Sequence, residues 1–206
     1  NTVLRNTYFL LSLTLLFSAA TAWYAMVSQA APVGIFVFLI GVFGLQFLTI
    51  KLRNSALGIL STFAFTGFLG YTLGPLLNFT LQSLSNGSEI ISTALASTGI
   101  IFVGLSAHAV ASRKNYSYLG GFITAAALIA FLGMFAAFVF QIPTMTLIIS
   151  GAWCVISSAF ILYTTSSIIH GGERNYIMAT ISLYVSIFNL FVSLLRILSF
   201  FAGNRD

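Results

Sequence analysis

The side chains with the clearest potential for chemistry lie in one apolar stretch near the end of the chain, "SLYVSIFNLFVSLLRILSF", residues 182–200. An α-helix turns by about 100° per residue, so the polar positions of this stretch fall on a single stripe about 80° wide. These positions are Ser182, Ser186, Asn189, Ser193 and Arg196. Polar groups in a helix suited to lipid face other protein segments or a water-filled cavity. The stripe therefore predicts a helix whose polar face turns inward, toward the centre of a helical bundle.

Two interpretations of this stripe stay open. Its hydroxyl and amide groups either hold neighbouring helices together by hydrogen bonds or line a conduction path, and the first is favoured because such bonds are common in membrane bundles. Arg196 either reaches the lipid headgroups with its long side chain or places a charge at the mouth of an internal cavity. A charge at the membrane centre costs at least about 2.5 kcal/mol, and a position near the helix end reduces that cost.

The elements that position the stripe are predicted to be membrane helices. The chain is 59% hydrophobic and 5% charged, with a mean hydropathy of +1.04, whereas soluble domains carry about a quarter charged residues. Its apolar runs are about 20 residues long and continuous, which excludes the short alternating strands of a barrel. We expect an all-α integral membrane protein that forms one seven-helix domain over residues 1–206. The predicted spans are Thr7–Val27, Val33–Ile50, Ser55–Leu77, Ile90–Ala111, Leu119–Phe140, Met145–Ile169 and Tyr176–Phe201.

Basic residues alternate between the two sides of this predicted bundle. Lysine and arginine occur before the first span and after the second, fourth and sixth, and they are absent from the other three connections. Because basic loops stay in the cytoplasm, we expect a cytoplasmic N-terminus and a periplasmic C-terminus, which carries Arg205. This rule accounts for the net charge of +5, and no basic–aromatic platform indicates a nucleic-acid partner. The chain begins at Asn1 without a methionine, so we expect that part of the natural N-terminus is missing.

Small residues recur in the third predicted span, "TGFLGYTLGPLLN". Gly67, Gly70 and Gly74 follow helical spacing, and the last two form a GxxxG pattern that lets another backbone approach closely. Pro75 removes one backbone donor and is able to kink a helix. Close packing is favoured over a gating hinge, because the GxxxG pattern is weakly specific in an apolar run.

Titratable residues argue against catalysis and against a metal. The three acids, Glu89, Glu173 and Asp206, lie outside the predicted spans, and the two histidines, His108 and His170, lie in separate elements. The sequence contains no HExxH motif, no paired aspartates within the spans, no Walker loop and no Gly-x-Ser-x-Gly turn. We therefore predict a protein without catalytic residues, metal or cofactor. His170 precedes a Gly-Gly turn and is interpreted as part of a loop that has some capacity to respond to pH.

Three segments together resemble one known family. The segments "TFAFTGFLGYTLGP", "NYSYLGG" and "IIHGGERNYIMATISLYVSIFNLFVSLLRIL" are similar to those of the Bax inhibitor 1 (transmembrane BAX inhibitor motif) family, and the resemblance covers most of the chain. It implies a seven-helix fold in which six helices surround a central C-terminal helix. The polar stripe alone had indicated the same central position for the last helix.

The resemblance also implies a calcium leak that responds to pH and depends on two aspartates. The first aspartate ends a family pattern that reads "ILYT" here, which places Thr164 at its position. The second ends a pattern that reads "LYVS" here, which places Ser186 at its position. Hydroxyl groups line wet cavities, but they do not titrate near neutral pH. We therefore expect the acid-gated leak to be lost in this chain while the fold is kept.

Within the family, the chain is most similar to the YccA-like proteobacterial branch. That resemblance implies a location in the bacterial inner membrane and two protein partners, the membrane protease FtsH and the HflKC complex. Proteins of this branch inhibit the protease as slow substrates that resist extraction from the bilayer. The short loops predicted for this chain suit a tightly folded substrate, and lipid is the remaining expected partner.

Overall fold

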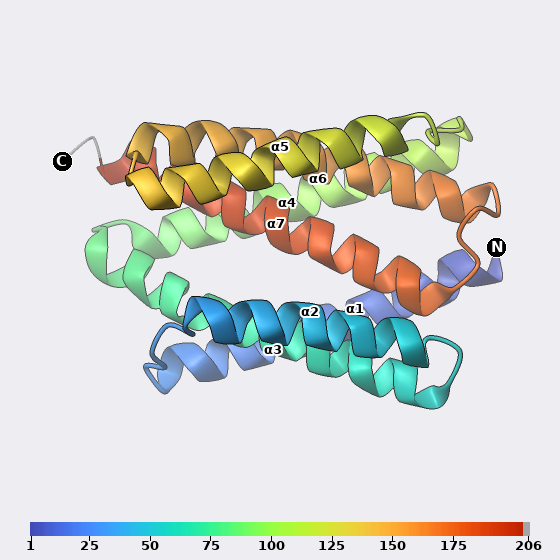
Figure 1. Ribbon diagram of the computed structural model, residues 1–206, viewed down its shortest axis with the longest axis horizontal. Helices are drawn as coiled ribbons and strands as arrows, with labels where there is room; N and C mark the ends of the chain where they lie inside the picture. Colours follow the sequence, from blue (N-terminus) through green and yellow to red (C-terminus); the bar gives the residue numbers. More distant parts are fainter. Residues whose placement is uncertain (204–206) are drawn as a thin grey trace. The chain divides into compact units, whose positions relative to one another are not determined.

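The computed structural model describes residues 1–203, apart from the Phe138 side chain. Helices account for nearly all of these residues (Figure 1). No strand occurs within residues 1–203, and all seven helices are long and apolar enough to cross a membrane. The all-α, seven-span prediction is therefore confirmed. The helices are α1 (Thr2–Val27), α2 (Ile35–Leu52), α3 (Ala56–Ser83), α4 (Gly87–Ser112), α5 (Leu119–Phe140), α6 (Pro143–Ile169) and α7 (Tyr176–Gly203). Arg205 and Asp206, which entered the prediction of the C-terminal side, lie outside the described residues.

The largest difference from the predicted boundaries is the end of α3, which continues through Pro75 to Ser83. The polar residues that suggested a loop after residue 77 instead form hydrogen bonds from within the helix. The Asn78 amide nitrogen donates to the Met26 carbonyl at 2.9 Å, and the Thr80 hydroxyl donates to the Leu76 carbonyl at 3.0 Å. Side chains satisfied in this way do not interrupt a membrane helix, and membrane helices tolerate proline for a similar reason.

The start of α4 also differs, because the helix begins at Gly87 rather than at residue 90. Glu89 therefore lies in the first turn of a helix able to cross the membrane, and not before it. A carboxylate is favourable at this place because the N-terminal end of a helix carries partial positive charge. The connection between α3 and α4 is reduced to residues 84–86.

The first of two compact units contains residues 1–83 and 173–184, that is α1, α2, α3 and the beginning of α7 up to Tyr184. In this unit α3 packs against both α1 and α2. Phe38 of α2 stacks on Phe68 of α3, with ring centroids 6.5 Å apart. Thr49 is the one fully buried side chain of α2, and the large apolar residues on its remaining surface suit contact with lipid.

The second unit contains residues 84–172 and the remainder of the chain from Val185. Here α6 packs against both α4 and α5. Ile123 and Ala130 of α5 and Ile156 of α6 form a buried apolar cluster. The exposed face of α5, like that of α2, carries large apolar side chains. The predicted single domain and central seventh helix stay predictions.

Candidate functional site

The helix that carries the polar stripe, α7, begins at a well-defined cap. The side-chain oxygen of Asn175 accepts the backbone N–H groups of Ile177 and Met178 at 3.0 and 3.1 Å. Its amide nitrogen donates to the Arg53 carbonyl and to the Asn54 side chain, both at 3.0 Å. One residue therefore both caps α7 and ties its start to the connection between α2 and α3.

The residues of the stripe differ in burial and belong to different units. Ser182, in the first unit, is half-buried. In the second unit, Ser186 and Ser193 are buried, with 2% and 5% of their surface exposed, and Asn189 is half-buried. Arg196 is exposed, and its guanidinium approaches the Met134 sulfur of α5 at 3.9 Å. Both interpretations of the stripe, and both of Arg196, stay predictions.

Buried side chains also occur on the opposite face of α7. At about 100° per residue, Tyr184 and Leu195 lie roughly 200° and 220° from Ser182, and both are almost fully buried. Burial therefore does not distinguish the polar stripe from the rest of the helix. The apolar face of α7 is as much a part of the protein interior as the polar one.

Tyr184 is the residue that the sequence reasoning missed. Its hydroxyl donates to the Thr66 carbonyl of α3 at 3.1 Å and forms a short hydrogen bond with the Ser18 hydroxyl of α1. Because tyrosine has one hydroxyl proton, Ser18 acts as the donor in the second bond. The ring packs edge-on against Phe65, with centroids 6.4 Å apart. A tyrosine in the middle of a membrane span was the available signal, since a buried phenol needs a polar partner.

A second hydroxyl bond joins the beginning of α7 to α1. The Thr180 hydroxyl lies 3.3 Å from the Thr7 carbonyl of α1 and 2.7 Å from the Tyr176 carbonyl of its own helix. Thr180 and Thr7 are completely buried. A threonine hydroxyl has one proton, and the shorter bond is the one to Tyr176, so Thr180 attaches α7 to α1 more weakly than Tyr184 does, about one helical turn away along α7. We call the hydroxyl groups of Tyr184, Ser18 and Thr180, together with their carbonyl partners in Thr66 and Thr7, the hydroxyl pins.

The glycines of α3 lie against α1, beside these pins. A methyl group on Gly70 would collide with the Ser18 carbonyl oxygen and would lie 2.5 Å from the Thr21 hydroxyl. One on Gly74 would lie 2.8 Å from the backbone of Ala25, and one on Gly67 would meet the Phe17 ring at 2.5 Å. Pro75 is enclosed in the same continuous helix. This geometry suits the close-packing prediction for the three glycines, and nothing in it bears on a hinge at Pro75.

The resemblance described above places Thr164 and Ser186 at the positions of two family aspartates. Both residues are buried in the second unit, with 4% and 2% of their surface exposed. Thr165 and Ser166, next to Thr164, are buried as well. This part of α6 is thus rich in hydroxyl groups, and α6 contains no acidic residue. Hydroxyl groups bind neutral donors and acceptors but carry no charge near neutral pH.

The two histidines hold the connection between α4 and α5. The Nδ1 atom of His170 lies 2.8 Å from the Ser166 carbonyl, and its Nε2 atom lies 3.0 Å from the Arg113 carbonyl. The Ser166 hydroxyl accepts the Tyr116 N–H at 2.9 Å, and the Tyr116 hydroxyl contacts His108 at 3.0 Å. Within residues 1–203 no cluster of three metal-binding side chains occurs. Both histidines contact the connection between α4 and α5.

Comparison with known proteins assigns the chain to a family. Residues 1–203 match the sequence model of the family described as "Inhibitor of apoptosis-promoting Bax1". The chain belongs to the Bax inhibitor 1 family. This confirms the resemblance seen in the three sequence segments.

Three Bax inhibitor 1 relatives align with almost the whole chain. An uncharacterized protein of Pseudomonas aeruginosa is 54% identical over 202 residues, which is 98% of this chain and 90% of the relative. The protein named "Modulator of FtsH protease YccA" of Escherichia coli K12 is 52% identical over 204 residues, 99% of this chain and 91% of the relative. The protein named "Inner membrane protein YccA" of Escherichia coli O6:H1 has the same identity and coverage.

Proposed function

We propose that this chain binds the membrane protease FtsH and modulates it, as the name of its Escherichia coli K12 relative states for that protein. The observation that carries the proposal is the 52% identity over 99% of the chain. The aligned 204 residues cover nearly the whole seven-helix chain. The proposed role is that of an interaction partner and not of an enzyme.

We further propose that the chain acts as a slow substrate. An AAA-type protease removes a membrane protein by pulling, and a pull from the N-terminal side reaches α1 first. The hydroxyl pins and the glycine contacts of α3 both hold α1. Extraction of α1 would break the bond of Tyr184 to Ser18 and the contact of Thr180 with the Thr7 carbonyl, at a cost that is raised where water is absent. A protease engaged on such a substrate stalls, and it then degrades its other substrates more slowly.

The location that suits this role is the bacterial inner membrane, with the N-terminus in the cytoplasm and the C-terminus in the periplasm. A relative is named an inner membrane protein. Arg5 lies near the start of α1, which begins at Thr2 and not at the predicted residue 7, and further basic residues lie at the end of α2 and in the connections after α2, α4 and α6, as expected for a cytoplasmic side. The HflKC complex is the second proposed protein partner. A reporter fused after Asp206 should be active only outside the cytoplasm; a fusion that is active in the cytoplasm would contradict this orientation.

A calcium leak is the weaker alternative. The residues at the two family aspartate positions, Thr164 and Ser186, offer no titratable group. No feature of the described residues favours ion passage over helix packing as the role of the stripe. We therefore do not propose this activity for the chain.

The test of the protease proposal uses the full chain with an affinity tag, expressed in bacterial membranes. We expect FtsH subunits to co-purify with it, and its decay after synthesis is stopped to require active protease. Replacement of Tyr184 by phenylalanine should speed this decay, because α1 is then held less firmly. Replacement of Tyr24, an exposed tyrosine of α1, should leave it unchanged. Equal half-lives for all forms with and without protease, and no co-purification, would overturn the proposal.

A further inference from the structure

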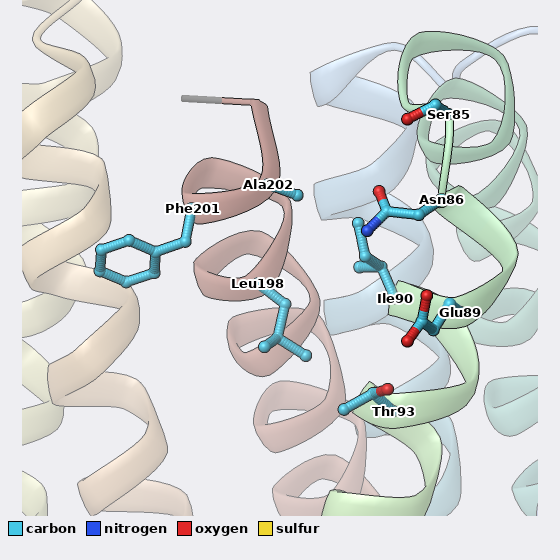
Figure 2. A pocket seen from close by; sticks show the side chains of 8 residues that line it. All are labelled: Ser85, Asn86, Glu89, Ile90, Thr93, Leu198, Phe201 and Ala202. Atoms are coloured by element: carbon cyan, nitrogen blue, oxygen red, sulfur yellow. The ribbon is translucent and has the colours of Figure 1, made fainter. Parts of the chain in front are cut away.

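A cavity of about 380 Å³ lies in the second unit between the beginning of α4 and the end of α7. Its α4 side is polar and its α7 side is apolar (Figure 2). Because α4 starts and α7 ends here, the cavity lies at one end of two helices that are able to cross the membrane. An end of a membrane helix is the level at which lipid headgroups meet acyl chains. The lining residues are Ser85, Asn86, Glu89, Ile90, Thr93, Leu198, Phe201 and Ala202.

The polar side of the cavity contains an acid, Glu89, for which residues 1–203 provide no ion-pair partner. Figure 2 shows the side chains of Asn86 and Glu89 extending from α4 toward α7. Within residues 1–203, neither a lysine nor an arginine forms an ion pair with the Glu89 carboxylate. Asn86 precedes α4 without capping it through its side chain, so its amide is also available to the cavity. The cavity therefore offers one negative charge next to a neutral hydrogen-bond donor.

The apolar side completes an amphipathic binding surface. Leu198 and Ala202 face the α4 side chains, whereas the Phe201 ring is directed away from them (Figure 2). Ile90 adds an apolar group beside Glu89. Apolar surface at this depth suits the upper part of an acyl chain.

We propose that this cavity binds a phospholipid whose headgroup carries a primary ammonium. The ammonium donates hydrogen bonds to the Glu89 carboxylate, the phosphate accepts from the Asn86 amide, and the start of an acyl chain packs on Leu198 and Ala202. Charge complementarity selects this ligand. A lipid with no cationic group places only its negative phosphate near Glu89, and a quaternary ammonium has no N–H to donate. The proposal concerns lipid selection and does not depend on the protease role.

The experiment measures lipid binding to the intact, detergent-purified chain by native mass spectrometry. The probes are phosphatidylethanolamine, phosphatidylcholine and phosphatidylglycerol of identical acyl composition. We expect phosphatidylethanolamine to bind most tightly. Since Glu89 is exposed, Glu89→Gln should weaken that binding by about two- to fivefold and leave the other two lipids unchanged. Glu173→Gln, which alters the one other acid of the described residues, is the matched control and should change nothing.

A second variant tests the place of binding. Ala202→Phe fills the cavity from the α7 side, so it should reduce phosphatidylethanolamine binding even where Glu89 is intact. Tightest binding of phosphatidylglycerol, or equal loss of all three lipids in Glu89→Gln, would overturn the proposed ammonium recognition. Unchanged phosphatidylethanolamine binding in both variants would overturn the site.

Discussion

Replacing Tyr184 by phenylalanine removes one oxygen atom from the interior and tests the hydroxyl pins directly. The change abolishes the bond to the Thr66 carbonyl and the bond with the Ser18 hydroxyl. The Thr66 carbonyl lies within α3, where helical backbone bonding continues to use it as an acceptor. Ser18, with 6% of its surface exposed, is left to bond back to a carbonyl of its own helix.

The expected loss of unfolding free energy follows from these two bonds. Hydrogen bonds between membrane helices contribute about 0.6 kcal/mol on average and at most about 1.7 kcal/mol. The loss of two such bonds, one of which the helix partly replaces, predicts a decrease of about 1–2 kcal/mol. This corresponds to a roughly five- to thirtyfold rise in the unfolded fraction. The edge-on packing of the ring on Phe65 is retained in the variant.

The assay is reversible unfolding of the purified chain in mixed micelles. The fraction of denaturing detergent is increased stepwise, and tryptophan fluorescence reports the fraction of unfolded chain. The matched control is Tyr24→Phe, the same chemical change at a residue that is 64% exposed, with an expected effect within about 0.5 kcal/mol. Combining Tyr184→Phe with Ser18→Ala should show a coupling energy of about 0.6–1.7 kcal/mol. Equal stabilities of the Tyr184 and Tyr24 variants, or a coupling energy near zero, would refute the reasoning.

The remaining predictions concern packing, capping and conduction. Gly70→Ala should lower the unfolding free energy by about 1–3 kcal/mol because the added methyl group meets the backbone of α1. Gly99→Ala, at a glycine with open space around it, should not lower it, and equal losses in the two variants would contradict this reasoning. Asn175→Ala should lower it by about 1 kcal/mol through loss of the α7 cap, and hydrogen exchange should rise at Ile177 and Met178; unchanged exchange would contradict the cap. Proteoliposomes that contain the chain should show little calcium entry at acidic or neutral pH, measured with an internal dye. Replacing both Thr164 and Ser186 by aspartate should make calcium entry depend on pH. A strong leak of the unmodified chain that acid switches on or off would contradict this.

The number and type of helices could be predicted from the sequence because lipid requires long apolar runs with satisfied backbone groups. The ends of α3 and α4 could not be predicted in the same way. Asn78 and Thr80 look like loop residues by composition, yet their side chains bond to carbonyls of α1 and α3. Polarity marks a loop only where the polar group has no partner within the bundle.

The candidate site was predicted in part. The periodicity of α7 identified the polar stripe, and two of its serines are buried, but side chains on the opposite face of α7 are buried as well, so the inward orientation stays a prediction. Tyr184 lies on the opposite face, outside the stripe, although it forms the bonds that join three helices. Helical periodicity gives the direction of a side chain but not its partner, since the partners Ser18 and Thr66 are more than 100 residues away.

The division of α7 between two compact units also lies beyond the sequence pattern. The helix is continuous in composition from Tyr176 onward, with no glycine or proline before residue 203. Nothing local therefore marks Tyr184 and Val185 as the point at which packing partners change. Such a boundary is set by contacts with distant segments, which one sequence does not display.

The measurement that tests the central claim most directly is the rate at which reconstituted FtsH degrades a fluorescent membrane reporter in the presence of increasing amounts of this chain. We predict that degradation of the reporter slows until the chain saturates the protease, and that the chain itself is degraded more slowly than the reporter. The Tyr184→Phe variant should be degraded faster and should slow the reporter less. A reporter rate that stays constant at every ratio of chain to protease would contradict the proposed modulation of FtsH.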